Sequence, residues 1–200
     1  DVALPICIPL TRIVTIQFHG REKQLHLAGA QELHFVNGDR LRGRLLRNED
    51  DNLVLDTFSL GEFTVKLDRL KGFVTLPQVG RPGRMADDMI DESAAATGRD
   101  QFLDQVLDRR GTTYKGILRK VSNDGIEIDH YDLLKVVPIP THYLAGVRLA
   151  PAGRQPAPAF STEPILRVST RDGSRFDGIL EKIALDRWQL HPTWDKEARL

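Results

Sequence analysis

The sequence predicts a mainly all-β protein, made of tandem, small, strongly bent five-stranded modules with little helix in the linkers between them. Two observations predict this fold class. A motif with two glycines five residues apart occurs three times, and apolar residues alternate with polar ones through each copy. Because successive side chains of a β-strand point to opposite faces, this alternation is typical of a half-buried strand. The 40% content of hydrophobic residues in 200 positions is that of a globular chain.

Glycines define the repeat and are expected to be structural. They occupy equivalent positions in the copies: Gly38, Gly43 and Gly72 in the first, Gly111, Gly116 and Gly146 in the second, and Gly173 and Gly178 in the third. The Asn-Gly and Asp-Gly pairs at the start of two copies are typical of hairpin turns, because these residues tolerate positive φ. The second glycine of each copy lies within a strand pattern, where glycine marks a bulge or a sharp bend.

The first copy shows the expected order of strands. Leu41 and Leu45 alternate with Arg40, Arg42 and Arg44, which indicates a strand with one apolar face. Three further apolar stretches, residues 53–55, 63–67 and 72–76, read as short strands. Turn-forming residues separate them, at residues 48–52 and 59–62.

The repeat and the composition of the linkers divide the chain into six parts. They are a closing strand and connector (1–29), a first module (30–77), an acidic Gly/Pro-rich linker expected to be mostly loop (78–100), a second module (101–150), an Ala/Pro-rich linker (151–164) and an incomplete third module (165–200). The Ala/Pro-rich linker is expected to be extended and to hold modules at a distance.

The start of the chain resembles the end of a module. Residues 9–16 are similar to residues 66–73, whereas the third copy ends before its own closing segment. Two explanations stay open. The chain is cut from a longer array, or residues 1–18 supply the strand that completes the third copy, within one chain or between neighbours, by β-augmentation.

Charge and motifs argue against several classes of function. With 28 basic and 28 acidic residues, the chain lacks the net charge of a general nucleic-acid coat or a binder of anionic membranes. A single cysteine, Cys7, excludes an internal disulfide, and no apolar run is long enough for a membrane-spanning helix. The histidines have no zinc-site spacing, although His26 and His34 flank a turn, and neither a phosphate loop nor a nucleophile motif is present. We therefore expect no enzyme activity, no cofactor, no metal site and no membrane insertion.

The strongest polar feature is an arginine stripe. Arg40, Arg42 and Arg44 share one face of a strand, where guanidinium groups can bind phosphate or carboxylate. The alternative is that they pair with acidic residues of neighbouring strands, at residues 49–51 and at Asp68. The other copies do not keep the stripe, which favours this alternative.

The repeated motif resembles that of the Sm-like proteins. Gly38, Leu41, Gly43 and Leu45 match the first motif of that family, and the triplet at residues 70–72 matches the second. The resemblance implies a bent five-stranded sheet that assembles edge to edge into rings and binds RNA.

By the same resemblance, Asn52 and Lys71 would contact RNA. The second copy has Gly125 and Ala145 at these places, which puts RNA binding in doubt. The tandem arrangement is also similar to repeat modules of large bacterial envelope proteins of planctomycete type.

Two functions follow as expectations. The first is a non-catalytic structural or interaction module that assembles through β-strand edges, with protein partners or with itself, as part of a larger protein or complex. The alternative is an Sm-like protein that binds single-stranded RNA, which the variable charges disfavour. The sequence does not fix the compartment, but the elongated repeat pattern favours the cell envelope or periplasm over the cytoplasm.

Overall fold

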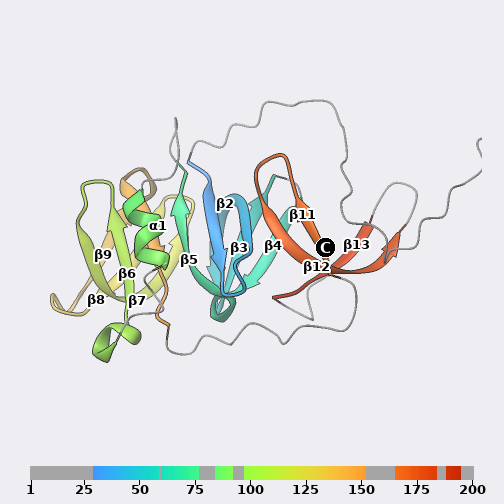
Figure 1. Cartoon of the computed structure of the whole chain (residues 1–200). Coiled ribbons are helices and arrows are strands. Elements are labelled where there is room, and N and C mark those ends of the chain that lie inside the picture. The colour runs from blue at the N-terminus through green and yellow to red at the C-terminus, as the bar shows by residue number, and fades with distance from the viewer. Residues whose placement is uncertain are drawn as a thin grey trace, which may run out of the picture.

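The computed structural model describes residues 29–58, 60–76, 84–91, 97–151, 165–183 and 188–194, and it confirms the mainly β fold. Within these residues, thirteen strands form one antiparallel sheet, with a single α-helix packed beside it. The strands form three groups, numbered here in chain order, that lie in a row. The first group lies between the second and the third (Figure 1).

The first group has the pairing order β5-β1-β2-β3-β4. Its elements are β1 (Gln31–Phe35), β2 (Arg40–Glu49), β3 (Asn52–Thr57), β4 (Gly61–Lys66), a 3₁₀ turn (Leu67–Arg69) and β5 (Leu70–Thr75). Strand β1 had not been predicted as a strand. It lies between β2 and β5, and all five of its residues are buried, including three polar ones.

The second group repeats this order as β10-β6-β7-β8-β9. Its elements are β6 (Asp104–Asp108), β7 (Thr113–Ser122), β8 (Gly125–His130), β9 (Lys135–Pro140), a 3₁₀ turn (Thr141–Tyr143) and β10 (Leu144–Arg148). The third group consists of β11 (Ile165–Ser169), β12 (Arg175–Ile183) and β13 (Trp188–Pro192), in the order β11-β12-β13.

Strands of different groups pair directly. Strand β5 pairs with β10, and Arg47 of β2 pairs with Ser122 of β7. Together with the pairs inside each group, these contacts close a ring of six strands, β2-β1-β5-β10-β6-β7. The first two groups therefore share one closed arrangement.

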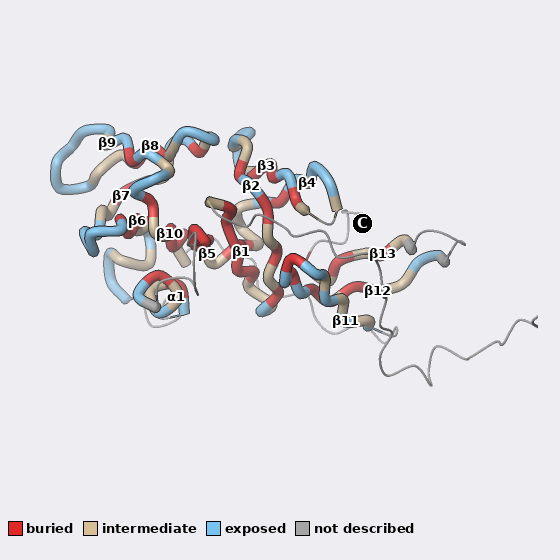
Figure 2. The backbone as a smooth tube through the Cα atoms, turned by 90° about the horizontal axis from the view of Figure 1, so that it is seen from above, coloured by how far each residue is buried: buried red, intermediate tan, exposed pale blue. Residues whose placement is uncertain are grey.

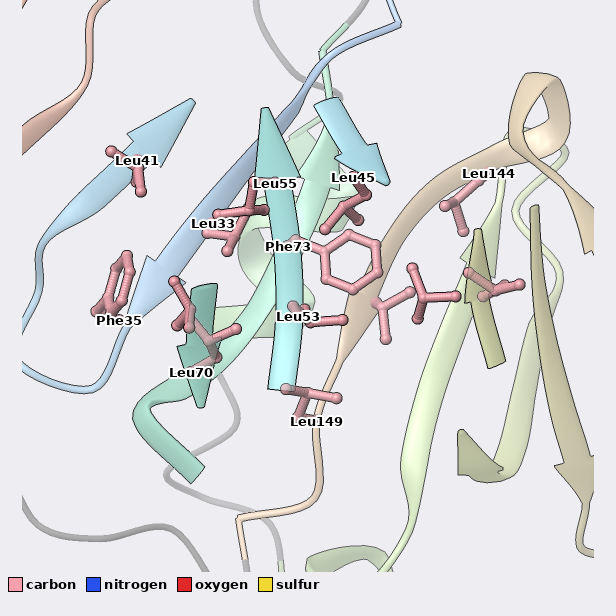
Figure 3. Close-up of a cluster of buried hydrophobic side chains, with 14 of the residues drawn as sticks. Leu33, Phe35, Leu41, Leu45, Leu53, Leu55, Leu70, Phe73, Leu144 and Leu149 are labelled. Atoms are coloured by element: carbon pink, nitrogen blue, oxygen red, sulfur yellow. The ribbon is translucent and has the colours of Figure 1, made fainter. Parts of the chain in front are cut away.

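The main hydrophobic core takes residues from all three groups of strands. Leu33, Leu53 and Phe73 are completely buried and point toward one another from β1, β3 and β5 (Figure 3). Val106 and Val147 extend the same core into the second group. Buried stretches run along the strands near the junctions of the groups, whereas the loop between β8 and β9 and most of β9 are exposed (Figure 2).

Each long strand carries a bulge shortly after its repeat glycine. The register shifts after Leu45 in β2, after Leu118 in β7 and after Leu180 in β12, two residues beyond the glycine in each case. The glycine serves a different need, because the next strand passes too close for a side chain. A Cβ at Gly116 would lie 2.0 Å from the carbonyl oxygen of Asp129.

The acidic linker contains a short helix, α1 (Arg84–Asp91), which buries Ala86 and Ile90 against Val74 and Leu107. The expectation that the Ala/Pro-rich linker holds modules at a distance was wrong, because β12 of the third group pairs with β2 of the first. Residues 1–28, with Cys7, His26 and the proposed closing strand, lie outside the described residues, so the structure does not test either explanation for them.

Candidate functional site

Two arginines of the predicted stripe converge on one buried carboxylate, that of Glu32 in β1. The Arg40 Nη1 donates to Glu32 Oε1 at 2.9 Å, and the Arg42 Nε donates to Oε2 at 2.6 Å. The register explains this meeting, because Glu32 lies directly opposite Arg42, and Arg40 lies opposite His34 two residues along β1. The His34 Nε2 is 3.3 Å from Glu32 Oε1 and 3.7 Å from Asp87 of α1.

The surroundings of Glu32 hold it in the ionised form. Burial alone raises its pKa, but the close contact with His34 and the hydrogen bond and charge of Arg42 outweigh burial and lower the pKa to about 2. The carboxylate therefore stays charged over the physiological range, and it neutralises one of the two guanidinium charges beside it.

The remaining predicted site residues lie apart from this cluster. Arg44 is exposed and lines a pocket of about 330 Å³ together with Asp56 and Asn123. This pocket has no lining residue in common with a second pocket, which contains Glu32, Arg40 and Arg42. Asn52 begins β3 opposite Lys66. Lys71 lies in β5, where its carbonyl oxygen accepts a hydrogen bond from the backbone N–H of Leu149. The three arginines of the stripe therefore line two different pockets, Arg40 and Arg42 the one and Arg44 the other.

The acidic partners predicted for Arg40 and Arg42 are not the ones observed. Glu49 pairs with Arg47, which lies in the same strand beyond the stripe, and the two side chains are about half exposed. Arg40 and Arg42 instead use Glu32, which the sequence analysis did not single out. The surrounding pattern concealed it, since polar residues at alternate positions of a strand usually face solvent, whereas β1 is covered on both faces.

The third group of strands approaches the arginines through reciprocal contacts. The Ser174 Oγ accepts a hydrogen bond from the backbone N–H of Arg42 at 2.8 Å, and the Asp39 carboxylate accepts one from the backbone N–H of Asp177 at 3.1 Å. Asp39 and Ser174 each lie four residues before their repeat glycine, so the two groups meet through equivalent residues. Burial raises the pKa of Asp39 despite its hydrogen bonds from Asn37 and Asp177.

An open pocket of about 270 Å³ lies beside this contact of β2 and β12. Its lining is Glu32, Arg40, Arg42, Ser169, Thr170, Gly173, Ser174 and Arg175. Three arginines against one carboxylate give the lining a positive excess. Arg175 belongs to the third copy and was not among the predicted site residues, because spacing along one strand does not record which other strand lies beside it.

The outer edges of the first two groups differ in their ability to add a strand. Strand β9 carries Pro138 and Pro140, and proline has no N–H to donate to a neighbour. In β4 the positions with the same register are Thr64 and Lys66. Among the described residues, β4 pairs only with β3 and β9 only with β8.

Comparison with protein families and with curated proteins gives no relative. No protein-family model matches the chain, and no curated protein matches it significantly. In the described part of the chain, no group of three His, Cys, Asp or Glu side chains is placed to hold a metal ion. None of the described helices has the length and apolar character needed to cross a membrane.

Proposed function

We propose that this chain is a non-catalytic structural or interaction module that assembles through β-strand edges, as part of a larger protein or complex. The observation that carries the proposal is that strand edges already join the parts of this chain. β5 pairs with β10, and β12 pairs with β2, so backbone hydrogen bonds connect segments that are distant in sequence. The same backbone chemistry is available to a separate chain.

The contrast between β4 and β9 indicates which edge is available. Prolines on an edge strand prevent unwanted pairing, because they remove donors that an added strand needs. β9 has two such prolines and β4 has none. The two strands otherwise have the same burial pattern, with one buried residue, Val65 or Ile139, in an exposed strand. We therefore assign the assembling edge to β4, with a second copy of the chain as its partner.

The Thr64→Pro variant tests this assignment. Thr64 is exposed and has the same register position as Pro138, so we expect the strand to accept proline at this position. We expect the unaltered chain to associate as its concentration rises in sedimentation velocity, and Thr64→Pro to remain monomeric. Thr64→Ala is the matched control and should associate like the unaltered chain.

The reverse variant, Pro138→Thr, restores a donor to β9 and should increase association. If the unaltered chain and Pro138→Thr both remained monomeric at high concentration, assembly through these edges would be overturned. Association of Thr64→Pro at the level of the control would reject β4 as the edge.

A further inference from the structure

The contact between β2 and β12 places two like charges opposite each other. Arg40 and Arg175 are directly paired in the register of the two strands. Directly opposed side chains on antiparallel strands lie on the same face, and like charges in this position destabilise the pair. Arg42 lines the same pocket. The pocket lining therefore holds three positive side chains and one carboxylate, that of Glu32.

Three acidic side chains at or near the pocket already accept hydrogen bonds, whereas Asp87 of α1, whose charge acts on Arg40, does not line it. Glu32 accepts hydrogen bonds from Arg40 and Arg42, one at each oxygen. The Asp172 carboxylate accepts from Ser174 and from Thr170.

Asp177 is also engaged, because its two oxygens accept from Arg167 at 2.8 and 2.9 Å. Within the described residues, the Arg175 guanidinium has no hydrogen bond or ion pair. It is exposed and lines the pocket beside Arg40.

We infer that this pocket binds a small oxyanion, a phosphate group or a similarly charged one, between the guanidinium groups of Arg40 and Arg175. Guanidinium donors match the oxygens of phosphate and carboxylate in geometry and charge. The hydroxyl groups of Ser169 and Thr170 line the same pocket, and its volume of about 270 Å³ admits a small organic molecule that carries such a group. The bound anion would join the first and third groups of strands.

Binding of inorganic phosphate tests the site. We expect phosphate to raise the midpoint of thermal unfolding above that in sodium chloride of the same ionic strength, because a ligand that binds only the folded state stabilises it. Calorimetric titration with phosphate should give one site per chain. The same midpoint in phosphate and chloride, together with no heat of binding, would overturn the inference.

The Arg175→Gln variant distinguishes this site from general screening of charge. It should weaken phosphate binding at least tenfold. Without phosphate it should be as stable as the unaltered chain or more stable, since it removes the opposition to Arg40. Arg119→Gln is the matched control, because Arg119 is an exposed arginine of β7 outside the pocket, paired with Asp129. Equal phosphate binding by Arg175→Gln and Arg119→Gln would overturn the assignment.

A second titration identifies the source of the oxyanion. A phosphate monoester such as glycerol phosphate would bind more tightly than inorganic phosphate if the pocket takes the organic part, and equally if it takes the phosphate alone. Both results support the site, whereas binding of neither compound rejects it. This inference stands apart from assembly through β4, because phosphate binding is measured on the unassembled chain and Thr64→Pro should leave it unchanged.

Discussion

Phe73 and Val147 lie directly opposite each other where β5 pairs with β10, and both are completely buried. Each follows the third glycine of its copy, Gly72 or Gly146, so the two groups of strands meet through equivalent residues. Equivalent residues also meet on the opposite side of the ring. There the Asn48 side chain accepts a hydrogen bond at 2.8 Å from the backbone N–H of Val121, the residue that corresponds to Asn48 in the second copy. The first two groups are therefore related by an approximate internal twofold axis.

This relationship predicts that Phe73 and Val147 act together in stability. Phe73→Ala should lower the free energy of unfolding by roughly 3–5 kcal/mol, because it leaves a cavity in the core shared by both groups. Val147→Ala should cost less, and the double variant should show a coupling of about 0.5–3 kcal/mol in a thermodynamic cycle. Urea unfolding followed by circular dichroism measures these values. Val136→Ala, at an exposed position of β9, is the control, and strictly additive effects would contradict the coupling.

The repeat glycines provide a graded prediction. A Cβ would lie 2.0 Å from a carbonyl oxygen at Gly116, 2.7 Å at Gly43 and 3.1 Å at Gly178. Because the obstructing atoms belong to the backbone of the next strand, alanine there must displace that strand. We expect destabilisation in the order Gly116→Ala, then Gly43→Ala, then Gly178→Ala, with about 1–3 kcal/mol for Gly43→Ala. The unfolding midpoints of the three variants check the order. A loss for Gly178→Ala as large as that for Gly116→Ala would refute close approach as the cause.

Sequence reasoning predicted the mainly β fold because the glycine spacing and the alternation of apolar residues are local features. It predicted strands around Leu41 and Leu53 for the same reason. It missed β1, where the alternation of polar and apolar residues is short, and that alternation gave no sign that Glu32 and His34 are buried. Their burial depends on residues distant in sequence, on α1 and on the third group of strands, and no local pattern records such contacts.

The candidate site was predicted only in part, for a similar reason. The stripe at Arg40 and Arg42 is visible in the sequence, but its partner Glu32 and its neighbour Arg175 come from other strands. By spacing alone, Arg44 is equivalent to the other two. In the structure it lines a different pocket, because β2 pairs with β1 only as far as Gly43 and then continues along β3.

Glu32 should make stability depend on acidic pH. Its pKa is lowered from 4.5 to about 2 in the folded chain, so its contribution is complete above 4.5 and is lost as the pH falls toward 2. At about 1.4 kcal/mol per pH unit, the contribution is about 3 kcal/mol. Glu32→Gln should therefore be less stable than the unaltered chain at neutral pH, and the difference should shrink between pH 4.5 and 2.

The control for this prediction is Glu49→Gln, which removes an exposed partner of Arg47 and should leave the pH dependence almost unchanged. Urea unfolding at a series of pH values provides the measurement. A difference between Glu32→Gln and the unaltered chain that stays constant down to pH 2 would show that Glu32 is not held in the ionised form by its neighbours.

Trp194 should hold the third group of strands against the first. Its ring lies 4.2 Å from that of Phe35 and 5.8 Å from that of Phe176, between centroids, and its side chain is 1% exposed. Trp194→Ala should cost roughly 3–5 kcal/mol and should expose residues 165–194 to proteolysis before the rest of the chain. Trp194→Phe keeps an aromatic ring in the contact and should be cut more slowly. Equal rates of cleavage for both variants would contradict this role.

Single-stranded RNA provides the test between the two function classes. The residues that the Sm-like resemblance implies as RNA contacts, Asn52 and Lys71, lie apart from the cluster of Arg40 and Arg42, and the backbone of Lys71 takes part in the contact with Leu149. We expect no binding of a fluorescent oligouridine at low salt, measured by anisotropy. Binding to RNA phosphates releases counterions and therefore weakens steeply as salt rises. Such salt-dependent binding would instead support the RNA-binding alternative if Lys71→Ala abolished it. Lys135→Ala, at an exposed site of β9, is the control and should leave such binding unchanged.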